Sequence, residues 1–285
     1  MVTGRELLKN TQARLEKAGL ENTAMEAAEL FALATNTDCR SGAAYGDALE
    51  AEADDKLAAA VGELTERRLS GEPLQYIIGE WEFYGLPIKV GKGVLIPRPE
   101  TELLISLSKA WQGERRSLAV IDLCSGSGCI GIAAAKHLDC EKVFCVELSE
   151  DALMYLEHNI ERNGVKNAVV IKGDVTLTQT ADSLPDADLI ICNPPYLTAQ
   201  DMRELQKEVT FEPEEALFGG EDGLDLYRDI TRIWSKKLKP GGMLIFELGI
   251  EQEESVAQMM IQHGLKNVRW RKDDFGKVRC IYGIR

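Results

Sequence analysis

Strand-like and helix-like segments alternate along the chain from about residue 117 onward. Apolar runs such as "AVIDL" and "ADLIIC" predict buried strands, while "SEDALMYLEHNIERNG" has the spacing of an amphipathic helix. The alternation continues through "KVFCVEL", "AVVIKGD", "GGMLIFELG" and the closing segments 266–271 and 278–284. This pattern is typical of an α/β fold with a mostly parallel sheet covered on both faces. Ligands of such sheets bind at the carboxyl ends of the strands.

The first part of the chain has a different pattern. Residues 3–70 are rich in Ala, Leu and Glu at helical spacing, which predicts several short helices separated by glycine and polar stretches. Residues 75–96 contain β-branched and aromatic residues with glycines at intervals, which indicates a β-hairpin. We therefore expect a helical domain at 1–72, a β-hairpin linker at 73–96 and a larger domain at 97–285. Pro97 and Pro99 precede a helix expected to begin near Glu102, with Thr101 as its cap.

Charge and cysteine usage narrow the classes of protein. The 285 residues include 33 Lys and Arg against 47 Asp and Glu, a net charge of −14, which does not suit binding to nucleic acid through its phosphates. The seven cysteines form no C-x-x-C pair and only three histidines occur, so we expect no metal site and no disulfide framework. The N-terminus has no apolar secretion segment, and no apolar run is long enough for a membrane span. We expect a soluble cytoplasmic protein.

A glycine-rich turn follows the first strand of the larger domain in "IDLCSGSGCIG", residues 121–131. Gly126 and Gly128 allow the backbone to approach a ligand closely. Together with Gly131 they also satisfy G-x-G-x-x-G, the fingerprint of dinucleotide sites, and Glu147 at the end of the next strand is placed for ribose hydroxyls. A purely structural turn remains an alternative at this point.

Acidic residues near this turn are compatible with S-adenosylmethionine. That cofactor has no pyrophosphate to bind, and Asp122 before the glycines is compatible with its cationic end. Asp174, which closes the third strand, is placed to receive the exocyclic amine of an adenine. A turn residue at a strand end is the other reading of Asp174.

The segment "LIICNPPY", residues 189–196, ends a buried strand in an amide and two prolines. The prolines fix φ and remove two backbone donors, so carbonyl groups remain available as acceptors. The oxygens of Asn193 and Pro194 are placed to accept both hydrogens of a planar NH₂ group, with Tyr196 stacked on it or bounding the pocket. This arrangement favours attack by a weakly nucleophilic nitrogen on a sulfonium methyl group through orientation and electrostatic stabilisation.

Four motifs in order resemble the peptide chain release factor glutamine methyltransferases (the PrmC/HemK family). They are "GEPLQYIIGEWEFYGL" at 71–86, "VLIPRPETELL" at 94–104, "ICNPPYL" around Asn193 and "FEPEEALFGGEDGLDLYRDI" at 211–230. The resemblance implies a Rossmann-like class I methyltransferase domain joined to a small N-terminal helical domain. It also implies methyl transfer from S-adenosylmethionine, giving S-adenosylhomocysteine, to the glutamine of a Gly-Gly-Gln loop in release factors. The helical domain would contact the release factor, and we expect a monomer without direct nucleic-acid binding.

The same resemblance implies roles for individual residues. The cofactor would be held by Cys124, Ser125, Gly126, Ser127, Gly128, Glu147, Asp174, Val175 and Asn193, with Arg98 and Thr101 lining its cleft. The catalytic segment would be Asn193, Pro194, Pro195 and Tyr196, with no metal. Two residues depart from the family pattern, since Cys124 replaces a usual glycine and Glu147 replaces a common aspartate. We expect altered cofactor affinity at most.

Three other functions remain open on the sequence. A DNA adenine-N6 methyltransferase also acts on a planar NH₂ group, but needs base flipping and a phosphate-binding surface. A nicotinamide-dependent oxidoreductase fits the glycines and gives Asn193 no role. A non-catalytic nucleotide-binding module docked on the translation apparatus would not need Asn193 either, so replacing this residue separates it from an enzyme.

Overall fold

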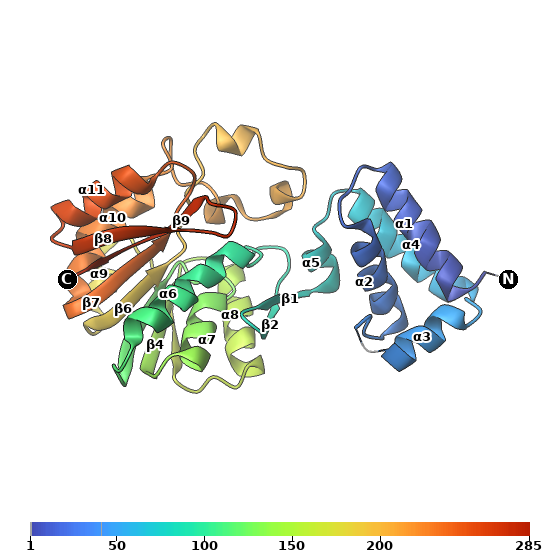
Figure 1. Cartoon of the computed structure of the whole chain (residues 1–285), viewed down its shortest axis with the longest axis horizontal. Helices are drawn as coiled ribbons and strands as arrows, with labels where there is room; N and C mark the ends of the chain where they lie inside the picture. The colour runs from blue at the N-terminus through green and yellow to red at the C-terminus, as the bar shows by residue number, and fades with distance from the viewer. Residues whose placement is uncertain (1, 41) are drawn as a thin grey trace. The chain divides into compact units, whose positions relative to one another are not determined.

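The computed structural model describes residues 2–40 and 42–285, which divide into two compact units. The first unit holds the described residues up to Gly79 together with Lys207–Phe211. The second holds Glu80–Gln206 and Glu212–Arg285. The chain therefore leaves the second unit after Gln206 and re-enters it at Glu212. Figure 1 shows the elements of both units, coloured along the chain.

The first unit is helical, in agreement with the spacing of its apolar residues. Its helices are α1 (Gly4–Lys17), α2 (Thr23–Thr35), α3 (Gly42–Glu50), α4 (Asp55–Leu69) and α5 (Leu74–Ile78). Thr3 and Glu6 form a capping box at the start of α1, and the side chain of Asp54 caps α4. Leu15 and Leu30 are fully buried in the core of this unit.

A buried ion pair lies within the same unit. The Arg68 side chain is only 2% exposed and donates two hydrogen bonds to the carboxylate of Glu26, at 2.8 and 3.0 Å. It also donates a 2.6 Å bond to Glu208, which belongs to the Lys207–Phe211 segment. Because a buried charge is tolerated only when it is paired and hydrogen-bonded, these carboxylates explain how Arg68 lies in the interior.

The expected β-hairpin is present but shorter than its predicted range. Strands β1 (Glu80–Phe83) and β2 (Leu86–Lys89) pair antiparallel. Tyr84 and Gly85 connect them, both with positive φ, as a tight two-residue hairpin turn requires. These strands occupy only the middle of the 75–96 segment.

The start of that segment is helical, which corrects the sequence-based expectation. Residues Leu74–Ile78 form α5, which ends at Gly79 in the left-handed conformation. Leu74 and Ile77 are buried in the core of the helical unit, and this packing outweighs the strand preference of their β-branched and aromatic neighbours. The boundary between the compact units accordingly falls at Gly79 rather than at residue 72.

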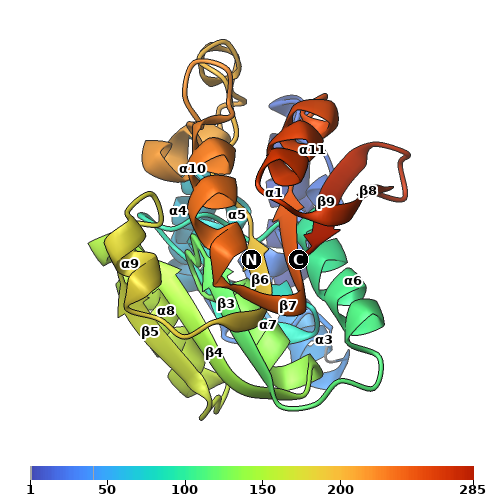
Figure 2. The ribbon, with the colours of Figure 1, turned by 90° about the vertical axis from the view of Figure 1, so that its left-hand side faces the viewer.

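The second unit is built on the predicted sheet. Its strands are β3 (Leu118–Leu123), β4 (Cys140–Glu147), β5 (Ala168–Lys172), β6 (Ala187–Cys192), β7 (Leu238–Glu247), β8 (Lys266–Lys272) and β9 (Val278–Ile284). Their order is β5-β4-β3-β6-β7-β9-β8, which can be followed across Figure 2. Pairing is parallel from β5 to β7, whereas β9 runs antiparallel to both β7 and β8.

Two groups of helices pack on this sheet. One comprises α6 (Glu102–Gln112), α7 (Cys129–His137) and α8 (Glu150–Arg162), and the other α9 (Thr178–Asp182), α10 (Asp225–Trp234) and α11 (Glu253–Gln262). The chain moves outward from β3 to β4 and β5 and then returns to β6 beside β3. The strand order therefore reverses between β3 and β6, and open α/β sheets bind ligands at such a switch point.

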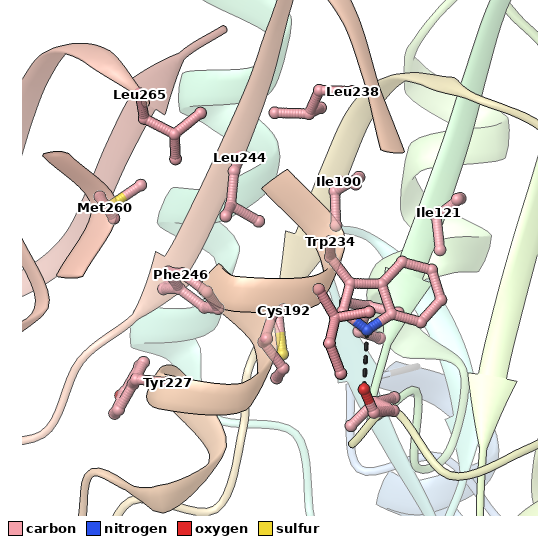
Figure 3. Close-up of a cluster of buried hydrophobic side chains, with 14 of the residues drawn as sticks. Ile121, Ile190, Cys192, Tyr227, Trp234, Leu238, Leu244, Phe246, Met260 and Leu265 are labelled. Carbon is pink, nitrogen blue, oxygen red and sulfur yellow. Dashed lines mark hydrogen bonds between the residues drawn. The ribbon is translucent and has the colours of Figure 1, made fainter. Parts of the chain in front are cut away.

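The main hydrophobic core of this unit fixes the loops of that switch point. Trp234, Tyr227 and Phe246 are fully buried in it, and Figure 3 shows these side chains gathered with aliphatic residues of the sheet. The indole nitrogen of Trp234 donates a 2.8 Å hydrogen bond to the carbonyl oxygen of Val175. This bond is the dashed line in Figure 3 and ties the loop after β5 to α10.

Candidate active site

A cavity of about 520 Å³ opens at the carboxyl ends of β3, β4, β5 and β6. The predicted site residues that line it are Arg98, Thr101, Cys124, Ser125, Gly126, Ser127, Glu147, Asp174, Val175, Asn193 and Pro195. Ile130, Val146 and Leu148 supply part of its apolar wall. Gly128, Pro194 and Tyr196 are not among the lining residues.

The loop after β3 has an unusual backbone at its first residue. Cys124 adopts a φ of 57°, in the left-handed region that glycine tolerates best. The next residue, Ser125, is held by two strands of the sheet. Its amide donates to the carbonyl oxygen of Val146 in β4, and its hydroxyl donates to the carbonyl oxygen of Asp122 in β3. Gly126 also has a positive φ, and no atom lies within 4 Å of where a Cβ would be. The turn therefore presents open backbone to the cavity.

The two later glycines of the loop serve packing. A Cβ on Gly128 would lie 2.3 Å from Leu156 of α8. One on Gly131 would lie 2.5 Å from the sulfur of Cys145 in β4. These close approaches explain why glycine occupies the last two positions of the G-x-G-x-x-G pattern, and the explanation does not require a bound pyrophosphate.

Asp122 does not face the cavity, which corrects its expected proximity to a cationic ligand. It is fully buried and accepts a 2.9 Å hydrogen bond from the Gly131 amide. Burial raises the pKa of its carboxyl to about 7, and the hydrogen bond from the Gly131 amide only partly opposes this effect. Asp122 therefore anchors the glycine loop to the helix that follows.

Glu147 and Asp174 bring carboxylates to the cavity from β4 and from the loop after β5. Glu147 accepts hydrogen bonds from the amides of Gly126, Leu148 and Ser149, at 2.7, 2.8 and 2.8 Å. In Asp174, Oδ1 accepts from both the amide and the hydroxyl of Thr176. Within the described chain no donor reaches its Oδ2, which leaves that oxygen for a ligand.

The N-P-P-Y segment begins where β6 ends, and Cys192 is in register with Leu123 of β3. Asn193 thus lies beside the glycine loop and contributes to the same cavity. Pro194 is buried, and no donor among residues 2–40 and 42–285 reaches its carbonyl oxygen. Tyr196 turns its hydroxyl to Glu247, with which it forms a 3.2 Å hydrogen bond, and burial raises its pKa.

The "PRPET" segment lies at the same edge of the sheet but differs in detail from the expectation. Helix α6 begins at Glu102 as predicted, yet the Thr101 hydroxyl makes no cap and donates instead to Glu247, at 2.5 Å. Arg98 forms an ion pair with Glu212, whose other oxygen accepts from the Ile96 amide. Both bonds hold this segment against the wall of the cavity.

Sequence reasoning did not single out Glu247, Glu212 or Gln252. The buried Gln252 side chain donates to the carbonyl oxygens of Tyr196 and Gly223 and so fixes the backbone after the prolines. Glu247 ends an apolar strand just as Glu147 does, and this position was a usable signal. Glu212 lies inside the motif at 211–230, but nothing in that motif indicates its pairing with Arg98, and no local pattern marks Gln252.

Two family models match most of the chain. One is described as the PrmC N-terminal domain and matches residues 6–79, and the other, the methyltransferase small domain, matches residues 100–220. A release factor glutamine methyltransferase of Geobacter sulfurreducens is 39% identical over 286 residues, which cover 99% of this chain and 96% of the relative. The chain belongs to the release factor glutamine methyltransferase family.

Another member of this family matches most of the chain, and two solved structures share its fold. The release factor glutamine methyltransferase of Streptomyces coelicolor is 36% identical over 85% of this chain and 83% of its own. The hMettl16 catalytic domain has a TM-score of 0.58 at 16% identity, over 81% of this chain and 80% of that one. A methyltransferase of Pyrococcus furiosus has a TM-score of 0.51 at 19% identity, over 71% of this chain and 90% of that one. These structures share the Rossmann-like class I methyltransferase fold of the family.

Two further properties of the described chain bear on function. No helix in it combines the length and apolar character that crossing a membrane requires. Within residues 2–40 and 42–285, no group of three or more His, Cys, Asp and Glu side chains is arranged to hold a metal ion.

Proposed function

We propose that this protein transfers a methyl group from S-adenosylmethionine to the side-chain amide nitrogen of the glutamine in the Gly-Gly-Gln motif of peptide chain release factors. Membership of the family supports the reaction, and it does not favour the DNA adenine alternative. The observation that carries the proposal is that Asn193 lines the same cavity as Gly126 and Glu147. A target amide held at Asn193 therefore lies beside the cofactor loop.

The residues of the cavity fit S-adenosylmethionine. Gly126 leaves open backbone, Glu147 retains acceptor capacity for hydroxyl groups, and Oδ2 of Asp174 is available for an amine. Ile130, Val146 and Leu148 form apolar surface for a planar ring. When bound, the cofactor supplies a methyl group on a positively charged sulfur and leaves as S-adenosylhomocysteine.

The target amide is oriented by acceptors on this chain. In this arrangement the side-chain oxygen of Asn193 accepts one N–H group of the target, and the carbonyl oxygen of Pro194, which stands between the cavity-lining residues Asn193 and Pro195, accepts the other. Two accepted hydrogen bonds favour a pyramidal nitrogen, whose lone pair is then available for attack. Orientation of this kind contributes roughly 7–11 kcal/mol in favourable cases. Because the amide proton becomes acidic only as the methyl group is transferred, no strong base is needed beforehand.

The partner is a protein, and the helical domain predicted at 1–72 is the part proposed to contact it. The match of residues 6–79 to the PrmC N-terminal domain supports a separate recognition module. The net charge of −14 supports a protein partner without direct nucleic-acid binding. We place the enzyme in the cytoplasm as a monomer.

Methyl transfer from radiolabelled S-adenosylmethionine tests the proposal directly. Three acceptors are compared: a purified release factor, the same factor with its Gly-Gly-Gln glutamine replaced, and adenine-containing DNA. Label on the unaltered factor alone supports the proposed function. Label on DNA, or on none of the three although the protein binds the cofactor, contradicts it.

A further inference from the structure

Thr101 and Glu247 form a buried pair behind Asn193. Their exposed fractions are 1% and 2%, and the Thr101 hydroxyl donates to Oε2 of Glu247 at 2.5 Å. The other carboxylate oxygen, Oε1, accepts from Tyr196 at 3.2 Å. Glu247 thus receives one hydroxyl group on each of its oxygens.

This pairing determines which atom Thr101 presents to Asn193. A threonine hydroxyl has a single hydrogen, and here that hydrogen is directed to Glu247. The Thr101 oxygen therefore turns a lone pair toward Asn193, 3.5 Å from Nδ2. Only the NH₂ end of the Asn193 amide is complementary to a lone pair, so the network fixes which way the amide lies.

The opposite end of the amide is then Oδ1. No donor in the described parts of the chain reaches this oxygen, and Asn193 lines the cavity. An NH₂ end turned to the target would meet the target's own NH₂ group, donor against donor. The orientation of one side-chain amide thus decides whether the site accepts a glutamine amide.

We propose that Glu247, acting through Thr101, is a positioning residue that holds Asn193 with its oxygen directed to the target amide. The inference rests on the proposed function and adds residues that carry no chemistry themselves. The 3.5 Å contact is at the long end for a hydrogen bond, and we expect it to shorten when the target amide binds.

This orientation of Asn193 requires that Glu247 accept the hydrogen of the Thr101 hydroxyl. Burial raises the pKa of Glu247, whereas the hydroxyl groups of Thr101 and Tyr196 and the positive charge of Arg279 lower it. The two hydroxyl donors, one on each oxygen, are the partners that a carboxylate requires.

Replacing Thr101 is the direct test, with turnover and cofactor binding measured separately. Thr101→Val keeps the shape but removes the lone pair, so kcat for release factor methylation is expected to fall about 10-fold to 100-fold, the range found for groups that orient metal ligands. The dissociation constant of S-adenosylmethionine, measured by calorimetry, stays within about threefold. Thr101→Ser restores kcat to within a few-fold because it keeps the hydroxyl. An unchanged kcat in Thr101→Val, or a fall that Thr101→Ser does not reverse, overturns the inference.

Thr231→Val is the matched control. Thr231 is fully buried in the same unit and donates to the carbonyl oxygen of Tyr227, so its loss reproduces the cost of removing a buried hydroxyl. Its kcat is expected to match that of the wild type. A fall equal to that of Thr101→Val would show a general effect of destabilisation and overturn the inference.

A double-mutant cycle shows whether Thr101 acts through Asn193. In an Asn193→Ala background, Thr101→Val is expected to cause no further loss in single-turnover rate, because the amide it orients is gone. Independent, multiplicative losses overturn the inference. The wild-type reaction in the same assay separates the proposed function from the inference about Thr101. If the wild type places no label on the release factor, the proposed function itself fails. If the wild type turns over and any of the contrary outcomes above is found, only the orientation by Thr101 fails.

Discussion

The amide nitrogen of Gly126 donates a 2.7 Å hydrogen bond to the carboxylate of Glu147, which joins the loop after β3 to the end of β4. Glu147 also lines the cavity proposed to bind the cofactor. The same side chain therefore shapes the loop and faces the cavity. The longer glutamate, in place of the aspartate common in the family, still reaches both.

Glu147→Ala is expected to weaken the binding of S-adenosylmethionine about 10-fold to 100-fold. Hydrogen bonds to a charged group contribute about 1.5–3 kcal/mol, and the change also leaves loop amides without their acceptor. Calorimetry gives the dissociation constant. Glu150→Ala is the control, since Glu150 is exposed and pairs with Lys172 outside the cavity. Equal affinities in the two variants would exclude the role given to Glu147.

Asn193→Ala is expected to lower the methylation rate about 100-fold to 1,000-fold, as the loss of one preorganised polar group in an active site does. Cofactor affinity is expected to change less than about tenfold. Asn163→Ala serves as control because the Asn163 side chain donates to the carbonyl oxygens of Pro87 and Asn159 and does not line the cavity. Near wild-type turnover in Asn193→Ala would favour a docking module over an enzyme.

Cys124→Val is expected to destabilise the second unit by about 1–2 kcal/mol. Cys124 has a φ of 57°, in the left-handed region, and a β-branched side chain is strained there. Cys124→Gly relieves that strain but gains freedom in the unfolded chain, so its stability is expected to stay within about 1 kcal/mol of the wild type. Denaturant unfolding followed by tryptophan fluorescence measures both. A more stable valine variant would contradict the backbone argument.

Arg68→Ala is expected to destabilise the helical unit by about 3–5 kcal/mol, because it leaves the buried Glu26 carboxylate unpaired. Arg14→Ala in the same unit is expected to cost less than about 1 kcal/mol, since Arg14 pairs with Glu66 in solvent. All four tryptophans lie beyond Gly79, so circular dichroism detects the helical transition that fluorescence does not. Comparable losses in the two variants would contradict the burial argument.

The stability of the second unit is expected to fall as pH rises from about 4 to 7. Burial raises the pKa of Asp122 from 3.8 to about 7, so in this window the native state binds a proton that the unfolded chain has lost. The effect amounts to a few kcal/mol, since each factor of ten in an acid constant is about 1.4 kcal/mol. Unfolding free energies at pH 5 and pH 8 test this. Asp122→Asn removes the titrating group and should flatten the profile; an identical slope in both proteins would show that Asp122 does not titrate there.

The order of strands and helices in the second unit was accessible from the sequence, because burial imposes a periodic pattern. The positions of Gly126, Glu147, Asp174 and Asn193 followed from the rule that ligands bind at strand ends. Glu147 and Asn193 indeed line one cavity although 46 positions separate them.

Other features depend on contacts that no local pattern encodes. The helix α5 forms where strand propensity was expected because Leu74 and Ile77 complete a core made by helices earlier in the chain. Thr101 looked like a helix cap, yet its partner Glu247 is 146 residues away. Glu208 pairs with Arg68, which lies 140 residues earlier in the chain. The segment Lys207–Phe211 therefore belongs to the first unit, although it is part of a loop between two strands of the second unit. Such pairings are set by tertiary structure alone.

The last strand of the chain, β9, lies between β7 and β8, and its residues Cys280 and Ile281 are fully buried. The chain produces β8 before β9, although β9 is the strand that joins β8 to β7. During synthesis β8 therefore emerges before its neighbour, and β7 keeps an unpaired edge until β9 follows. Two strands that are consecutive in sequence must accordingly join the parallel part of the sheet together.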